Sequence, residues 1–195
     1  MYANLVPTEK WRNAMTLPRE LKLKTIGADI FVTSVPVAEL ANIQSKPIIA
    51  ENVQLSAKFD VNNKMGQVKF PCQLNLHLDE SKDISIVLSN EAGNEVVIGY
   101  DNRARQFFID RTKSGKTSFN KEFAARHIAP RLINNSKMDI TLIIDVSSVE
   151  LFADEGLTVM TSIFFPDKSF NKIRIESTQN AVIKQLEYVS LQSIW

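Results

Sequence analysis

Most of the chain consists of short runs in which apolar and polar residues alternate. Residues 53–59 place an apolar side chain at every second position, from Val53 to Phe59, and residues 72–78 do the same. Because successive side chains of a β-strand point to opposite faces, a period of two predicts strands with one buried face. We predict strands over residues 17–24, 30–35, 53–59, 72–78, 84–88, 96–100, 106–109, 140–144, 149–153, 159–165, 173–175 and 182–191.

Turn-forming residues separate these runs. Asn, Asp and Gly gather at residues 90–94 and 101–102, where they favour tight turns. Many short alternating strands, with hardly any period of 3.6 residues, predict an all-β fold rather than a parallel α/β fold. We expect a two-sheet antiparallel β-sandwich, jelly-roll or concanavalin-like, with about a dozen strands. Only residues 120–127 predict a short helix, with Asn120 as its N-cap and Phe123 facing inward.

Composition narrows the possible partners. The 195 residues suffice for one sizeable domain plus a connector. The 23 basic and 22 acidic residues are scattered, so neither nucleic acid nor a membrane surface is expected as a partner. No apolar run reaches the roughly 20 residues that span a bilayer. The single Cys72 excludes an internal disulfide.

Residues 1–21 have the character of a connector between domains. They lack the basic, apolar and small-residue succession of a secretory leader, and Trp and Pro interrupt them. We therefore expect the chain to be part of a longer protein.

Three segments carry recognisable motifs. Residues 1–21 contain Tyr-Ala-Asn, Pro-Thr, Trp-Arg and Ala-Met-Thr-Leu-Pro-Arg-Glu-Leu, and residues 110–115 contain Asp-Arg, then Ser-Gly. Residues 145–156 read Asp-Val-Ser-Ser-Val-Glu-Leu-Phe-Ala-Asp-Glu-Gly. Together they resemble glycoside hydrolase family 32, the levanases, inulinases and invertases, at the end of the catalytic propeller and through the C-terminal β-sandwich. Many members have Arg at the position of Val146. This chain therefore lacks a cation that could have paired with Asp110 or Asp145.

This resemblance implies a division of the chain and a role for it. Residues 1–21 would be the junction from an N-terminal propeller of the same polypeptide, and residues 22–195 the β-sandwich domain. In this family an Asp nucleophile and a Glu acid/base on the propeller cleave the fructosyl bond. Their motifs are absent from residues 1–195, so we expect no catalytic residue and no cofactor here. The parent enzyme would be periplasmic or secreted, in a bacterium.

The same resemblance predicts an interface with the propeller. Its expected residues are Trp11, Arg12, Met15 and Leu17. Of these, Trp11, Met15 and Leu17 should form an exposed apolar patch in the isolated domain. If the chain itself covered this patch, the interface would be wrong.

Two pairs of charged residues are candidates for chemistry. Asp110 and Arg111 form either a turn-ordering ion pair or a clamp for vicinal sugar hydroxyls. Asp145 and Glu150 flank an apparent turn at residues 147–148, and pairing across it would bring their Cβ atoms to about 5 Å. An independent hydrolase using these two carboxylates is therefore one hypothesis, set against a purely structural role for a solvated hairpin tip.

Other motifs have simpler interpretations. His77 and His127 lack a close third ligand, so no metal site is expected. Residues 114–117 end like a phosphate-binding loop, but Asp110 occupies the position of its first glycine. A carbohydrate-binding module for fructan oligosaccharides is the alternative to a supporting domain. Trp11 and Trp195 could serve it as stacking platforms, although contact with the missing domain or strand closure fits them better.

Overall fold

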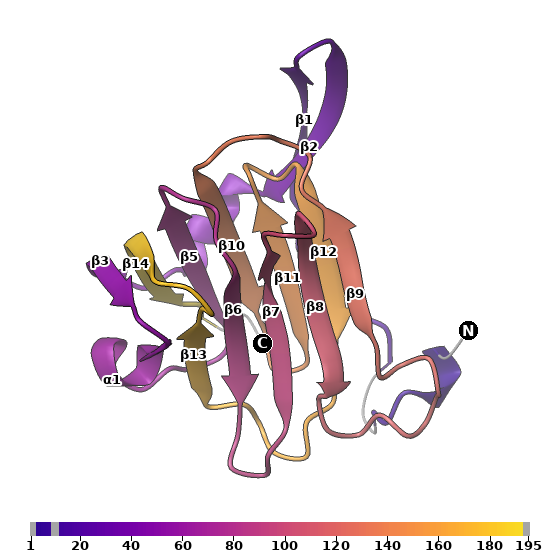
Figure 1. Cartoon of the computed structure of the whole chain (residues 1–195). Helices are drawn as coiled ribbons and strands as arrows, with labels where there is room; N and C mark the ends of the chain where they lie inside the picture. Colours follow the sequence, from indigo (N-terminus) through magenta and orange to yellow (C-terminus); the bar gives the residue numbers. More distant parts are fainter. Residues whose placement is uncertain (1–2, 9–11, 193–195) are drawn as a thin grey trace.

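Two six-stranded antiparallel sheets face each other and form a β-sandwich (Figure 1). The computed structural model describes residues 3–8 and 12–192. The first sheet has the order β12 (Thr158–Ile163), β11 (Ser148–Ala153), β10 (Met138–Ile144), β5 (Cys72–Leu78), β14 (Ala181–Ser190), β3 (Ile48–Leu55). The second has the order β4 (Lys58–Asp60), β13 (Lys172–Glu176), β6 (Ile84–Ser89), β7 (Glu95–Asp101), β8 (Gln106–Lys113), β9 (Arg126–Pro130). The predicted sandwich is confirmed.

The core lies between the sheets, where alternate residues of each strand point inward. On β5 the even-numbered residues from Cys72 to Leu78 are buried, whereas Gln73, Asn75 and His77 face outward. Burying a large apolar side chain contributes about 1.5–3 kcal/mol. The period of two seen in the sequence therefore records which face of each strand meets the core.

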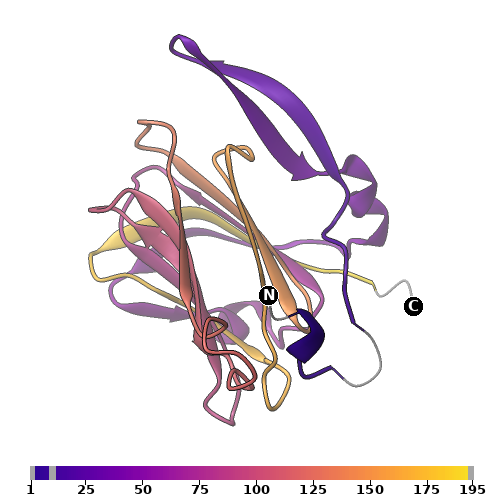
Figure 2. The ribbon, with the colours of Figure 1, turned by 90° about the vertical axis from the view of Figure 1, so that its right-hand side faces the viewer.

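A third, two-stranded sheet stands off one end of the sandwich (Figure 2). β1 (Arg19–Ile26) and β2 (Asp29–Pro36) pair antiparallel, with Leu23 opposite Val32. Gly27 has φ 62° in the tight turn between them, a left-handed conformation that two-residue hairpin turns require. The predicted boundary between residues 21 and 22 falls inside β1, so the hairpin takes residues from both proposed segments.

The helix predicted over residues 120–127 is wrong. Asn120 does accept the backbone N–H of Glu122, at 2.8 Å, but the chain makes only turns before β9 begins at Arg126. A single helical turn fixes many dihedrals for one hydrogen bond, and here pairing with β8 is available instead. The short α-helix is α1 (Val61–Met65), where Asp60 caps the Asn63 N–H at 3.2 Å.

The predicted strand 53–59 is two strands in different sheets. Val53 and Leu55 end β3 in the first sheet, and Phe59 lies in β4 of the second, while Ala57 between them is exposed. The apolar period continues through the crossing, so the pattern could not reveal it. Two 3₁₀-helices, η1 (Ala3–Leu5) and η2 (Ala38–Ile43), complete the regular elements of the described residues.

Cys72 should be unreactive in the folded chain. Its side chain is fully buried, and burial raises the pKa of its thiol to about 12, so disulfide reagents can neither reach the sulfur nor find the thiolate that they attack. Titration with a chromogenic disulfide reagent should give no signal before urea is added and one thiol per chain afterwards. Rapid labelling of the folded chain would contradict this packing of β5.

Candidate functional site

The outward face of the β1–β2 hairpin is an exposed apolar surface. Leu21 and Leu23 of β1 and Ile30 and Val32 of β2 are 65%, 75%, 68% and 59% exposed. Leu23 lies opposite Val32. Leu21 lies two residues before Leu23, and Ile30 lies two residues before Val32, so all four side chains share one face. We call these four residues the hairpin face.

The opposite side of the hairpin packs on the sandwich. Thr33 is buried, and the backbone N–H of Ser34 donates to the carbonyl of Gly156 at 2.9 Å. The ammonium of Lys24 lies 2.8 Å from the Glu155 carboxylate. Gly156 has φ 79°, and a Cβ there would clash with the Ser34 carbonyl and lie 2.8 Å from Val35 Cγ1. Only glycine fits this close approach.

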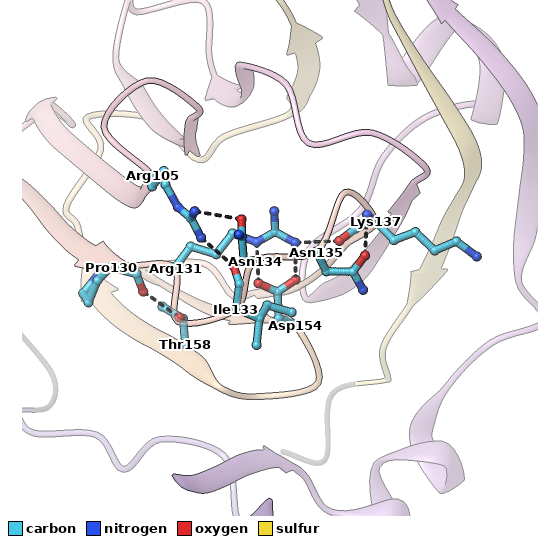
Figure 3. A network of polar contacts seen from close by, with 9 residues as sticks. All are labelled: Arg105, Pro130, Arg131, Ile133, Asn134, Asn135, Lys137, Asp154 and Thr158. Carbon is cyan, nitrogen blue, oxygen red and sulfur yellow. Dashed lines mark hydrogen bonds and ion pairs between the residues drawn. The ribbon is translucent and has the colours of Figure 1, made fainter. Parts of the chain in front are cut away.

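A buried ion pair holds the turn that contacts the hairpin (Figure 3). Arg131 donates to both carboxylate oxygens of Asp154, at 2.7 and 3.0 Å, and each side chain is 2% exposed. Arg131 directly follows β9 and Asp154 directly follows β11, so the pair joins the two sheets at one corner. Burial by itself lowers the pKa of Arg131, but the hydrogen bond and charge of Asp154 outweigh it and raise that pKa.

The same corner is fixed by neighbouring hydrogen bonds. The Arg131 guanidinium also donates to the carbonyl of Lys137, and the Thr158 hydroxyl donates to that of Pro130 at 2.8 Å. Asp154 has φ 50°, so the carboxylate sits on a left-handed turn. The turn is therefore held both by its backbone and by its side chain.

Glu150 anchors the segment that enters β1. Its carboxylate accepts the backbone N–H of Leu17 at 2.8 Å and forms an ion pair with Arg19. Arg19 also donates to the Thr161 hydroxyl at 3.0 Å, and its guanidinium lies 5.2 Å from the centre of the Phe152 ring. Leu17 packs beside Phe152 in a small apolar cluster on the outer face of the first sheet.

The predicted interface residues thus have different environments. Leu17 is partly covered by its own domain, whereas Met15 is 97% exposed. Arg12 is exposed and donates to the carbonyl of Asn4. Trp11 lies outside the described residues. The sequence pattern did not indicate the hairpin face, because alternation in 17–24 and 30–35 shows that one face is apolar but not whether it is covered.

Asp145 and Glu150 do not face each other across the turn. Glu150 lies opposite Ile143, and the backbone N–H of Asp145 donates to Ser148 at 2.9 Å. The Asp145 side chain is exposed and accepts from Val146, while Glu150 is 6% exposed with both oxygens occupied. The register excludes a cross-turn acid pair.

Asp110 and Arg111 lie on β8, where neighbouring side chains point to opposite faces. Asp110 accepts from the backbone N–H and the hydroxyl of Thr112, at 2.9 and 2.7 Å. Arg111 is 3% exposed, donates to the Phe123 carbonyl at 2.7 Å and lies 3.9 Å from the centre of its ring. Arg111 therefore fixes the turn at residues 120–125.

The described residues contain neither a cluster of metal ligands nor a helix that could span a membrane. His77 belongs to the first sheet and His127 to the second, and within residues 3–8 and 12–192 no three His, Cys, Asp or Glu side chains gather as metal ligands. Burial and the charge of Arg111 lower the pKa of His127. None of the helices in these ranges has the length and apolar character needed to cross a bilayer.

Comparison with known families identifies the domain. The family described as the C-terminal part of glycosyl hydrolases family 32 matches residues 35–192. The chain belongs to this family. The match begins within β2 and covers both sheets of the sandwich, so it confirms the resemblance carried by residues 110–115 and 145–156.

Relatives of this family 32 domain are longer proteins. A levanase of Bacillus subtilis is 32% identical over 200 residues, covering 100% of this chain and 29% of the levanase. An extracellular exo-inulinase of Aspergillus awamori is 29% identical over 182 residues, covering 91% of this chain and 34% of the relative. The chain spans about a third of the length of these relatives.

Solved structures confirm the fold. The crystal structure of the A. awamori exo-inulinase superposes with a TM-score of 0.85 at 27% identity, over 100% of this chain and 39% of that one. The β-fructofuranosidase of Schwanniomyces occidentalis gives 0.83 at 20% identity, over 98% and 43%. The family 32 domain therefore occupies less than half of each of these solved chains.

Replacing Asp154 with Asn should strongly destabilise the domain. The change leaves the buried Arg131 charge without a counter-charge, which costs about 3 kcal/mol of unfolding free energy. Urea unfolding followed by far-UV circular dichroism would measure it. Asp145→Asn is the matched control, because Asp145 is exposed and a surface change there costs less than about 0.5 kcal/mol. Equal effects of the two substitutions would contradict the role of the pair.

Replacing Glu150 with Gln should release the entry segment. The variant loses the charge that pairs with Arg19 and weakens the acceptor for the Leu17 N–H, at a cost of about 1–2 kcal/mol. Hydrogen exchange should become faster in a peptide covering residues 12–19. Glu155→Gln, which removes the exposed partner of Lys24, serves as the control and should leave that peptide unchanged.

Proposed function

We propose that this chain is the non-catalytic C-terminal β-sandwich of a fructan-hydrolysing enzyme, and that it packs against an N-terminal catalytic domain of the same polypeptide. The length difference from the levanase and exo-inulinase relatives supports a further domain. The extracellular exo-inulinases among these relatives support a secreted parent enzyme. The activity and the substrate are those named for these relatives, and they are assigned to the parent enzyme of this chain as part of the proposal.

The hairpin face is the observation that carries this proposal. An isolated two-stranded hairpin is marginally stable in water, and this one buries only the side that meets the Gly156 turn. Its other side presents four large apolar residues together. Contiguous exposed apolar surface of this kind marks interaction sites, and covering each side chain contributes about 1.5–3 kcal/mol.

Residues 1–21 would connect the catalytic domain to the sandwich and place it beside this face. Glu150 fixes Leu17 and Arg19 at the start of β1, so the segment before Leu17 reaches the sandwich at the base of the hairpin. Met15 is free to join the interface, together with Arg12 and Trp11 as the sequence predicts. Leu17 instead contributes by fixing the direction of the segment.

Binding of a fructan oligosaccharide by the domain itself is a second candidate function. A partly polar groove on the outer face of the first sheet favours it.

Polar substitutions on the hairpin face should weaken domain association. Leu23→Ser with Val32→Ser removes a directly opposed pair and should raise the dissociation constant for a separately expressed cognate catalytic domain by about a hundredfold. An NMR titration of the labelled chain would measure this constant. Ile128→Ser, at an apolar residue of β9 that is 58% exposed, is the control and should not change it.

Two results would count against the proposal. Unchanged association of the double variant would remove the hairpin face from the interface. Release of fructose from levan or inulin by the purified chain alone would show that the domain is catalytic.

A further inference from the structure

A groove of about 400 Å³ crosses the outer face of the first sheet. Its floor is formed by β5 and β10 in the middle of that sheet. The end of β2 and the helix η2 form one wall, and the turn at Glu155 and Gly156 contributes to the lining. A volume of this size is in the range of small-molecule sites.

The floor carries polar side chains at fixed positions of the strand register. His77 lies opposite Asp139, and Thr141 lies opposite Asn75, which shares this face of β5 but is not among the lining residues. Gln73 is two residues further along β5, on the same face. Groups held on central strands are more precisely placed than groups on loops, so this row is suited to recognition.

These side chains also orient one another. His77 Nδ1 is 2.6 Å from Asp139 Oδ1, and the Thr141 hydroxyl donates to Asn75 Oδ1 at 3.0 Å. Gln73 donates to the same Asn75 oxygen at 3.0 Å and accepts from Gln44 of the wall at 2.8 Å. His77 and Asp139 nevertheless remain 48% and 50% exposed, so their outward atoms are open to a ligand.

The wall is apolar where the floor is polar. Val35, Pro36 and Leu40 line one side, and Phe152 of β11 lies beside Thr141 on the floor. A sugar ring has this same division, because its hydroxyls lie around the rim and its C–H groups form an apolar face. Pockets that bind small molecules combine an apolar lining with a few placed polar groups in this way.

The charge of the groove selects against anions. Its described lining residues include the carboxylates of Asp139 and Glu155 and no lysine or arginine. A phosphate would meet the Asp139 carboxylate on the floor, and the Lys24 ammonium beside the groove is already paired with the Glu155 carboxylate at 2.8 Å. Amide, hydroxyl, imidazole and carboxylate groups together offer both donors and acceptors, as a neutral polyhydroxyl compound requires.

We propose that this groove binds a fructosyl unit of a neutral oligosaccharide. His77 and Asp139 form hydrogen bonds with its hydroxyl groups, and the apolar wall that contains Leu40 covers its C–H face. The choice of fructose among neutral sugars rests on the proposed function. The choice of a neutral polyol rests on the groove alone.

NMR titration of the ¹⁵N-labelled chain tests the proposal. Short inulin-type and levan-type oligosaccharides should shift the amide signals of His77, Asp139 and Thr141, with a dissociation constant on the order of 1 mM. Maltotriose, a neutral glucan, should shift these signals less, and fructose 6-phosphate should not shift them. Shifts located outside the groove, or no shifts with either fructan probe, would overturn the proposal.

Substitutions then assign the contacts. His77→Ala and Asp139→Ala should each weaken binding about tenfold, as expected for the loss of a hydrogen bond to the ligand. Gln185→Ala is the matched control, since Gln185 lies opposite His77 on the other neighbour of β5 but does not line the groove. Equal affinity of all three variants would overturn the assignment.

A final titration separates this site from the domain interface. If the cognate catalytic domain, added as a separate chain, displaced the oligosaccharide and shifted the same amides, the groove would be a protein-binding surface and the proposal would be wrong. If the sugar bound but the two domains did not associate, the docking role of the hairpin face would fail and the sugar site would stand.

Discussion

The buried pair of Arg131 and Asp154 joins the two sheets, and it also fixes the turn against which the β1–β2 hairpin packs. A guanidinium with almost no access to water requires a carboxylate that accepts two of its N–H groups at once. Asp154 does so from the left-handed turn that follows β11. That turn places Gly156 beside Ser34, where the missing Cβ allows backbone contact. The position of the hairpin therefore depends on an ion pair between two residues that lie outside the hairpin.

Glu150 provides a second fixed point on the same sheet. Its low exposure and its two occupied oxygens show that a carboxylate next to a turn can serve to orient another segment. Asp154 acts on β2 through the turn backbone, whereas Glu150 acts on the entry to β1 through its side chain. Together they fix both ends of the hairpin base relative to the sandwich and leave the hairpin face outward.

The sequence predicted the strands well, because a period of two directly reflects burial between two sheets. It failed where the period carries no such information. The apolar positions run without interruption from Val53 to Phe59 although the chain changes sheets at Ser56 and Ala57. At Asn120 the side chain does accept the Glu122 N–H, but the chain makes only turns before Arg126 to Pro130 pair with β8. The partner of Asp154 is 23 residues away, so local pattern could not reveal it.

If the hairpin face binds the catalytic domain as proposed, the anchoring of Leu17 and Arg19 also sets how strongly that face must bind. A domain joined through the segment before Leu17 is held near the face by the covalent chain, at an effective concentration of about 1 mM for a short linker. With a dissociation constant of about 0.1 mM, such a domain would be docked about 90% of the time. A patch of four side chains is then sufficient, and it stays small enough to limit association between separate molecules.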